Sequence, residues 1–306
     1  MNSAIDSAAA ADGLIIVDKP AGWTSHDVVA RMRRTAKTRR VGHAGTLDPM
    51  ATGVLVLGIG KATRLLGRIS LTGKSYDATI RLGIATSTDD AQGETLYVTD
   101  VRRLAGERAR IEAAIAGLTG QIFQRPSSVS AIKIDGQRAY KRVRAGEEVK
   151  LAERRAIVSE FKLCGVAAVH SAQGPVVDLD VTVSVSSGTY VRALARDLGD
   201  HLGVGGHLTA LRRTRVGPYS LTDASTLEEL ETQLRVLNLA DVSRAMFQSV
   251  DLETDDAKII SHGGRLAWPA GCDTERPVAI FGPDGAPLAL AEYKDSQLAP
   301  VVVWTP

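Results

Sequence analysis

The order of apolar and polar residues along the chain predicts a mixture of strands and helices. Residues 176–185 (VVDLDVTVSV) alternate between apolar and polar positions, as a strand with one buried face does. Residues 76–82 alternate in the same way over a shorter span. Unbroken apolar runs are typical of strands buried on both faces, and they occur at 13–17 and 54–57. A further short strand is predicted at 207–211.

Helices are predicted where apolar residues recur every three or four positions. Thr24 or Ser25 caps a helix with apolar positions at Val28, Val29 and Met32, and Gly120 stops a helix at 104–118. The segment 86–93 (TSTDDAQG) is typical of a turn that forms a hairpin or a bulge. Strands and helices are mixed without βαβ regularity, which favours an α+β fold with a mainly antiparallel sheet. Further helices are predicted at 61–71, 189–202 and 228–234.

The pattern changes near Phe247, where short apolar runs separated by glycine and proline begin. Such runs, for example 278–281 and 301–304, predict a small C-terminal β domain at 247–306. An all-β cap without a binding role is the alternative. The polar, alanine-rich start at 1–12 is predicted to be a disordered tail, which leaves 13–246 as the main domain.

Composition narrows the class of protein. The chain has 306 residues, enough for one large domain and a small one, and it has no apolar run of the length that spans a bilayer. Its start has no basic residues and no long apolar core, so it is a poor signal peptide. Two cysteines far apart, Cys164 and Cys272, predict a reduced, cytoplasmic protein without a cysteine-ligated metal.

Charge is distributed unevenly. The net charge is +2, but residues 251–306 carry nine acidic and four basic side chains, so the first 250 residues carry +7. This basic body predicts an anionic partner. Two stretches concentrate the positive charge: 31–40 (RMRRTAKTRR) and 125–155, where nine Lys or Arg face four acids. Phosphate contacts are the functional interpretation of the first stretch, and a solvated helix face is the alternative.

The stretch that carries the chemistry is 41–57 (VGHAGTLDPMATGVLVL), in which Asp48 is the single carboxylate. Its glycines allow tight backbone turns, and Pro49 biases Asp48 away from helical geometry. Asp48 is therefore predicted to lie on a rigid loop that the following strand anchors. A plain strand-to-strand turn with Asp48 as a turn residue is the alternative.

The stretch GHAGTLDPMATGVL resembles the catalytic motif of the TruB family of tRNA pseudouridine synthases, with Asp48 at the position of the catalytic aspartate. Three further blocks match in the same order: Lys19-Pro20, Lys74-Ser75-Tyr76, and 186–199 (SSGTYVRALARDLG). The resemblance covers about residues 13–219. It departs at Arg155, where family members commonly have a proline.

The resemblance implies catalytic roles for three residues. Asp48 attacks C1′ of a flipped-out uridine, stabilises positive character there or removes a ribose proton, and the sequence does not choose among these roles. A paired guanidinium from Arg192 favours the ionised form of Asp48 and holds it in place. Tyr76 stacks on the base and takes the C5 proton. A turn residue, a surface arginine and a core aromatic are the respective structural alternatives.

The same resemblance implies contacts with the substrate. His43 fills the space that the flipped base leaves, and Lys19 and Pro20 shape the pocket floor, with a phosphate contact as the alternative for Lys19. Tyr190 and Leu211 are candidates for the pocket wall, or for packing alone. The stretch 125–155 corresponds to an insert that closes over the RNA stem-loop, with an ordinary surface segment as the alternative.

The resemblance implies an isomerase that converts the T-loop uridine at tRNA position 55 to pseudouridine, without a metal or cofactor. By position, residues 247–306 correspond to the family's PUA RNA-binding domain. Two other functions remain: a tRNA-binding folding factor without essential catalysis, and a synthase of the same chemistry on another RNA. No obligate protein partner and no membrane partner are implied.

Overall fold

The computed structural model describes residues 12–127, 133–134, 137–138 and 152–304. The predicted tail at 1–12 lies outside the described residues except for Asp12, whose carboxylate accepts a hydrogen bond from the Lys61 amide. The predicted insert at 125–155 is described only at its two ends and in two short paired strands, β8 (Lys133–Ile134) and β9 (Gln137–Arg138).

A ten-stranded sheet forms the body of the molecule, in the order β14-β1-β3-β12-β4-β11-β10-β7, with β2 beside β3 and β13 beside β12. The pairs described in this sheet are antiparallel except β3 with β12. Its strands are β1 (Gly13–Lys19), β2 (Val41–His43), β3 (Thr52–Ile59), β4 (Lys74–Leu82), β7 (Gly120–Gln124), β10 (Arg154–Ser171), β11 (Gly174–Val185), β12 (Gly206–Val216), β13 (Tyr219–Ser220) and β14 (Leu237–Asn238).

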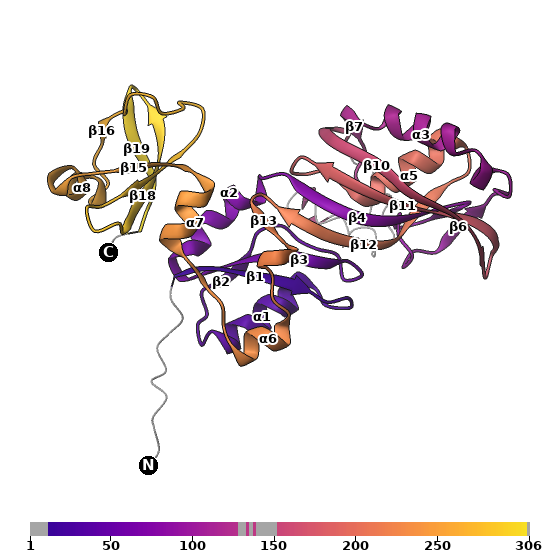
Figure 1. The fold of residues 1–306 in the computed structure, drawn as a ribbon, viewed down its shortest axis with the longest axis horizontal. Helices are drawn as coiled ribbons and strands as arrows, with labels where there is room; N and C mark the ends of the chain where they lie inside the picture. Colours follow the sequence, from indigo (N-terminus) through magenta and orange to yellow (C-terminus); the bar gives the residue numbers. More distant parts are fainter. Residues whose placement is uncertain (1–11, 128–132, 135–136, 139–151, 305–306) are drawn as a thin grey trace, which may run out of the picture.

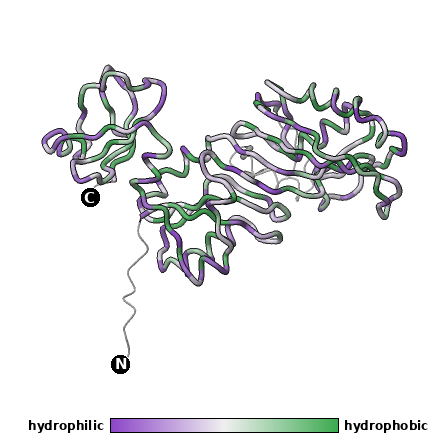
Figure 2. Tube along the Cα trace, in the orientation of Figure 1, coloured by the Kyte–Doolittle hydropathy of each residue, from purple (hydrophilic) through white to green (hydrophobic). Residues whose placement is uncertain are grey.

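The buried and exposed positions in the sheet correspond to the apolar and polar positions in the sequence. In β11 the alternating apolar side chains are buried against the helices, whereas Asp178 and Thr182 between them face the other side. In β1 and β3 nearly every side chain is buried, because helices cover both faces there. In Figure 2 these strands and the C-terminal sheet carry long hydrophobic stretches. The predicted α+β class with a mainly antiparallel sheet is confirmed.

Helices α3 and α5 cover one face of the β4–β11–β10–β7 half of the sheet (Figure 1). Thr24 caps α1 together with Asp27, and Gly203, in the left-handed region at φ 72°, ends α5. The helices are α1 (Ser25–Thr35), α2 (Leu66–Ser70), α3 (Arg108–Gly117), α5 (Val191–Leu202), α6 (Leu227–Thr232), α7 (Leu239–Met246) and α8 (Thr254–Ser261), with 3-10 turns η1 (Gly60–Leu65), η2 (Leu104–Gly106) and η3 (Leu221–Asp223).

Several predicted boundaries are wrong. The helices expected at 61–71 and 104–118 each begin as a 3-10 turn, and α5 begins two residues later than expected. The strand expected at 207–211 continues to Val216, because each arginine in the extension has a partner. Arg212 pairs with Asp18, Arg213 donates to backbone carbonyls, and Arg215 donates to the Ser75 hydroxyl.

The predicted turn at 86–93 is confirmed: it connects the two strands of a hairpin, β5 (Ile84–Thr86) and β6 (Thr95–Val98). Strand β10 was not predicted.

A second sheet of five strands follows from Gln248, in the order β15-β17-β18-β19-β16. It shares a hydrophobic cluster with the main sheet, in which Phe281, Leu290 and Trp304 pack with Leu65 and Val216. None of the helices in the described part of the chain is long and apolar enough to cross a membrane. The strands are β15 (Gln248–Asp251), β16 (Leu266–Ala267), β17 (Val278–Phe281), β18 (Pro287–Lys294) and β19 (Gln297–Val303).

Candidate active site

Asp48 lies on the loop between β2 and β3. Gly45 at φ 90° and Gly53 at φ 97° bound this loop, and both angles are in the region that side chains other than glycine rarely adopt. The carbonyl of Asp48 accepts a hydrogen bond from the amide of Ala51 at 3.1 Å, which closes a tight turn over Pro49. The Asp48 side chain is 37% exposed. It is thus held on a stiff turn and remains open to solvent.

Side chains from two other elements fix the backbone of this loop. The hydroxyl of Ser25, at the start of α1, accepts from the Leu47 amide at 2.9 Å and lies 3.2 Å from the Leu47 carbonyl. The ammonium of Lys19, at the end of β1, donates to the carbonyls of Trp23 at 2.7 Å and Pro49 at 3.4 Å. The residues on both sides of Asp48 are therefore anchored.

Arg213 is a third anchor of the loop, and no role was predicted for it. Its side chain is almost fully buried, and its guanidinium donates to the carbonyls of Val54 at 2.7 Å, Thr46 at 3.3 Å and Gly45 at 3.2 Å. Across the β4–β12 pair, Arg213 lies opposite Tyr76. One buried guanidinium thus ties the entrance and the exit of the Asp48 loop to the central strands.

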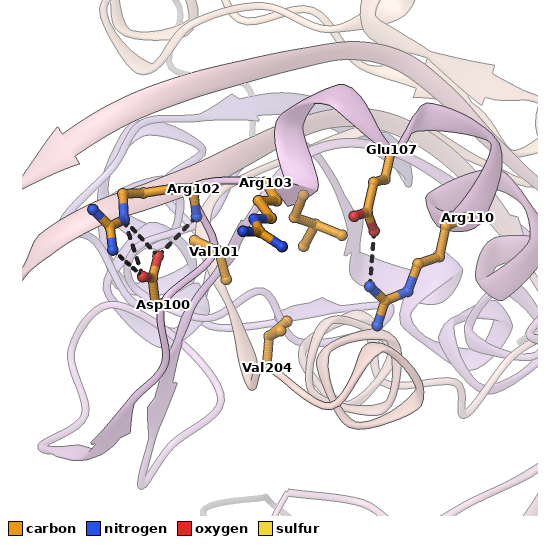
Figure 3. Close-up of a pocket in the computed structure, with 8 residues that line it drawn as sticks. Asp100, Val101, Arg102, Arg103, Glu107, Arg110 and Val204 are labelled. Carbon is orange, nitrogen blue, oxygen red and sulfur yellow. Dashed lines mark hydrogen bonds and ion pairs between the residues drawn. The ribbon is translucent and has the colours of Figure 1, made fainter.

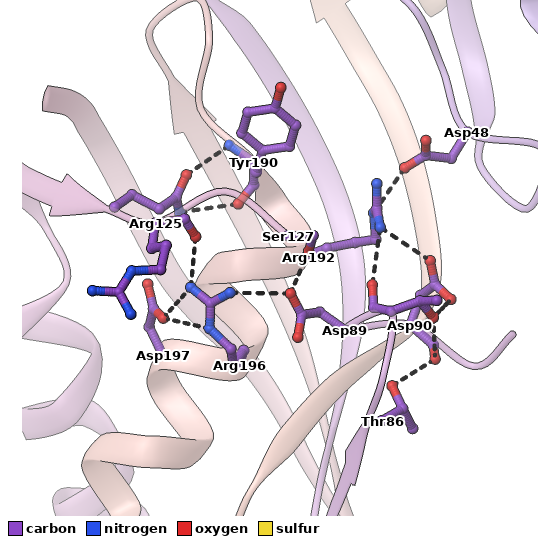
Figure 4. Close-up of polar contacts among 12 residues, drawn as sticks. Asp48, Thr86, Asp89, Asp90, Arg125, Ser127, Tyr190, Arg192, Arg196 and Asp197 are labelled. Atoms are coloured by element: carbon purple, nitrogen blue, oxygen red, sulfur yellow. Dashed lines mark hydrogen bonds and ion pairs between the residues drawn. The ribbon is translucent and has the colours of Figure 1, made fainter. Parts of the chain in front are cut away.

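Arg192 comes from the first turn of α5 and reaches Asp48. Its Nε lies 3.0 Å from Oδ2 of Asp48, and its Nη1 donates to the Thr88 carbonyl at 2.9 Å and lies 3.6 Å from Oδ2 of Asp90 (Figure 4). The structure therefore places Asp48 beside Arg192, as predicted. Asp90 and Thr88 were not predicted, because in the sequence their segment carries only the signature of a turn.

A second group of polar residues supports the same region. Arg196, one helical turn after Arg192, donates to the Asp89 carboxylate at 3.1 Å and to the Arg125 carbonyl at 2.7 Å. The Ser127 hydroxyl also donates to Asp89 (Figure 4). Burial raises the pKa of the Asp89 carboxyl, although the hydrogen bond from Ser127 and the charge of Arg196 oppose the shift. Helix α5 is thus joined to the loop at 88–90 and to the end of β7.

Four other predicted residues come from β2, β4, β12 and the N-cap of α5. Tyr76 and Leu211 are 7% exposed and belong to the same core cluster as Leu47. Tyr190 is the N-cap residue of α5. His43, at the end of β2, packs edge-on against the ring of His26, with ring centroids 5.3 Å apart.

Four buried cations surround the Asp48 loop: Lys19, Lys74, Arg192 and Arg213. Burial lowers the pKa of Lys19 to about 8; the charge of Asp48 opposes this shift, and that of Arg213 adds to it. Burial, with a smaller contribution from Arg213, also lowers the pKa of Lys74 to about 8. The Lys19 side chain is fully buried, with its ammonium against the carbonyls of Trp23 and Pro49.

This arrangement suits chemistry at a single carboxylate. Asp48 is accessible, whereas the side chain of Arg192 is only 7% exposed, so that a substrate meets the carboxylate and not the guanidinium behind it. Within the described residues, no group of three or more His, Cys, Asp and Glu could hold a metal ion. A cation-backed carboxylate can stabilise or attack an electron-poor carbon, as in glycoside chemistry.

A cavity of about 760 Å³ lies elsewhere, between the segment that leads into α3 and the end of α5 (Figure 3). Two of its arginines are paired with acids that also line it, Arg102 with Asp100 and Arg110 with Glu107. None of the predicted site residues lines this cavity. This cavity is therefore separate from the residues that the sequence predicts for the site.

Comparison with known proteins identifies the family of this chain. Residues 33–191 match the model of the TruB family pseudouridylate synthase N-terminal domain, and residues 192–251 match that of the tRNA pseudouridylate synthase B C-terminal domain. A tRNA pseudouridine synthase B of Thermobifida fusca is 56% identical over 96% of this chain and 99% of its own. That of Mycobacteroides abscessus is 54% identical over 96% of both chains.

Solved structures share the fold. A chain in a structure titled as a Cbf5-Nop10-Gar1 complex matches with a TM-score of 0.71 and 27% identity, over 96% of this chain and 85% of the other. A chain in an H/ACA RNP bound to a substrate RNA matches with a TM-score of 0.71 and 25% identity, over the same shares. From its matched domains and its relatives, this chain belongs to the TruB family of tRNA pseudouridine synthases, which are isomerases.

Proposed function

We propose that the protein isomerises the T-loop uridine at tRNA position 55 to pseudouridine, with Asp48 as the catalytic carboxylate. The observation that carries the proposal is the accessible Asp48 carboxylate, held 3.0 Å from a buried guanidinium on an anchored loop. The family supports tRNA as the substrate, and the motif resemblance supplies the position within the T loop.

The reaction needs no atom beyond those of the substrate. The N1–C1′ bond of the uridine breaks, the uracil rotates, a C5–C1′ bond forms, C5 loses its proton and N1 gains one. Asp48 serves either by adding to C1′ or by removing a ribose proton, and both routes need the carboxylate anion. Arg192 holds that anion in place.

Tyr76 takes the C5 proton late in the reaction, and its ring stacks on the base. A uridine within a folded RNA loop cannot reach Asp48, so the nucleotide is flipped out, and His43 occupies the space it leaves. Tyr190 and Leu211 form the pocket wall, and Lys19 and Pro20 form its floor. Tyr76 and Leu211 are buried on the paired strands β4 and β12, where Tyr76 lies opposite the loop anchor Arg213, and Lys19 is buried against the Pro49 carbonyl. These positions support the proposed roles.

The RNA surface combines the basic stretch at 31–40 with the C-terminal sheet as a PUA-like domain. Within 31–40, Arg31 is engaged in the fold: it pairs with Glu231 and lies over the Trp23 ring. The exposed Arg34, Arg39 and Arg40 are better placed for phosphates. The proposed clamping insert at 125–155 falls largely outside the described residues. The substrate places the enzyme in the cytoplasm.

The test is tritium release from an unmodified tRNA transcript labelled at uridine C5, with no added metal, followed by mapping of the modified position. Asp48→Asn nearly preserves shape, so we expect turnover to be lost while the Kd for tRNA changes by less than about threefold. Asp178→Asn is the matched control, because Asp178 also accepts a guanidinium, from Arg81, on the outer side of the sheet.

Release at position 55 that depends on Asp48 establishes the proposal. Tight tRNA binding by the wild-type enzyme without any release points to the folding-factor alternative. Release at another position keeps the chemistry and changes the substrate site. Near-normal release by Asp48→Asn removes Asp48 from the mechanism.

A further inference from the structure

We propose that Gln124 is a positioning residue for Arg192, acting through the first peptide groups of α5. This inference rests on the proposed function, because it concerns how the Asp48–Arg192 pair is held. Gln124 is the last residue of β7, and its side chain is only 2% exposed. It lies 66 residues before its partner, Tyr190.

The Gln124 carboxamide holds both backbone groups of one residue. Its Nε2 donates to the Tyr190 carbonyl at 3.0 Å, and its Oε1 accepts from the Tyr190 amide at 2.8 Å. A carboxamide carries a donor and an acceptor side by side without any change of protonation, as this pair of contacts requires. Tyr190 itself makes no side-chain cap for α5. Gln124, on strand β7, therefore holds the N-cap residue of α5 in place.

This contact is close to the catalytic pair. Arg192 follows Tyr190 by two residues, and the Tyr190 carbonyl accepts the Leu194 amide at 3.2 Å, so the residue that Gln124 holds also begins the helix. Any shift of Tyr190 moves the base of the Arg192 side chain. A misplacement of about 1 Å in a catalytic constellation is enough to cost on the order of 100-fold in rate.

Gln124 is one of a series of contacts between the end of β7 and α5. The carbonyl of Arg125 receives Arg196 one turn further along the helix, and Ser127 donates to Asp89. These contacts keep the strand end against the helix even when the carboxamide is removed. Loss of Gln124 should therefore loosen the first turn of α5 without unfolding the sheet.

The test compares three variants under single-turnover conditions. Gln124→Met keeps the length of the side chain and removes both hydrogen bonds. Gln124→Glu keeps the acceptor and, when ionised, loses the donor, and it decides the matter if the methionine variant fails to fold. Gln121→Met is the matched control, because Gln121 lies on the same strand but points to solvent, where it accepts from Arg155.

We expect Gln124→Met and Gln124→Glu to lower the single-turnover rate about 10- to 100-fold, with the Kd for tRNA within threefold and Gln121→Met at the wild-type rate. If Gln124 acts through Arg192, adding Gln124→Met to Arg192→Lys should slow that variant less than threefold further. A general loss of stability would move the melting temperature and the Kd without this non-additivity.

Three results overturn the inference alone: a wild-type rate in the Gln124 variants, a rate loss matched by an equal loss of tRNA affinity, or full additivity with Arg192→Lys. Absence of turnover in the wild-type enzyme overturns the proposed function, and the inference with it.

Discussion

Replacing Arg192 by lysine should slow the reaction severely although the charge is kept. The Nε of Arg192 contacts the Asp48 carboxylate, and its Nη1 donates to the Thr88 carbonyl and lies near the Asp90 carboxylate. A lysine carries one ammonium on a flexible stem, so it can serve Asp48 or the loop at 88–90 but not both. The side chain is 7% exposed, which leaves little room for water to replace the lost contact.

The size of the effect follows from the contact that is lost. A hydrogen bond to a charged group contributes about 1.5–3 kcal/mol, and about 1.4 kcal/mol corresponds to a factor of ten in rate. If the pair is needed in the transition state, the single-turnover rate of Arg192→Lys should fall roughly 10- to 150-fold. The Kd for tRNA should change little, because Asp48 shields the guanidinium from the substrate.

The assay is tritium release from C5-labelled tRNA with enzyme in excess, so that the rate reports chemistry and not binding. Arg81→Lys is the control, since Arg81 makes two hydrogen bonds of 2.8 and 2.7 Å to Asp178 on the outer side of the sheet. That variant also breaks a two-point ion pair and should keep the wild-type rate. A rate for Arg192→Lys within threefold of wild type would refute the role assigned to the pair.

Two further predictions concern the loop itself. Gly53→Ala should lower the unfolding free energy by about 3 kcal/mol or more. The added Cβ would lie 2.2 Å from the Arg213 carbonyl oxygen, on backbone at φ 97°. Urea denaturation measures this loss, and a loss under about 1 kcal/mol would contradict the prediction. Burial lowers the pKa of Lys19 to about 8, so the folded protein releases this proton at a lower pH than the unfolded chain does. The unfolding free energy of the wild-type protein should therefore rise between pH 8 and 9.5. The rise should exceed that of Lys19→Met by on the order of 1 kcal/mol. Parallel pH profiles of the two proteins would show that the lysine is not titrating there.

The strands could be predicted wherever one face is buried, since alternation then records the environment directly, as in β11. The Asp48–Arg192 pair could also be predicted, but from matched motifs and not from local physics. Neither source revealed that Arg213 anchors the site. An arginine in a strand suggests a surface position, so the burial of Arg213 was invisible until its three carbonyl partners were known.

Asp90 and Gln124 show the same limit. The sequence around Asp90 has the composition of a turn, and nothing local indicates that its carboxylate faces Arg192. Gln124 binds a backbone peptide, and a backbone peptide leaves no trace in the identity of the partner residue. Contacts of this kind depend on the packing of distant segments, which periodicity and capping rules do not describe.

The hydrophobic cluster shared by the two sheets affects how cooperatively the chain unfolds and how far apart its two parts are held. Phe281, Leu290 and Trp304 lie in one apolar interior with Leu65 and Val216. The C-terminal sheet is therefore packed against the main domain. Separating the two would expose apolar side chains of both, so they should unfold in one cooperative transition. The spacing between Asp48 and the C-terminal sheet is then fixed when the chain folds. Under the proposed function, an RNA that contacts both must therefore match that spacing in shape as well as in charge.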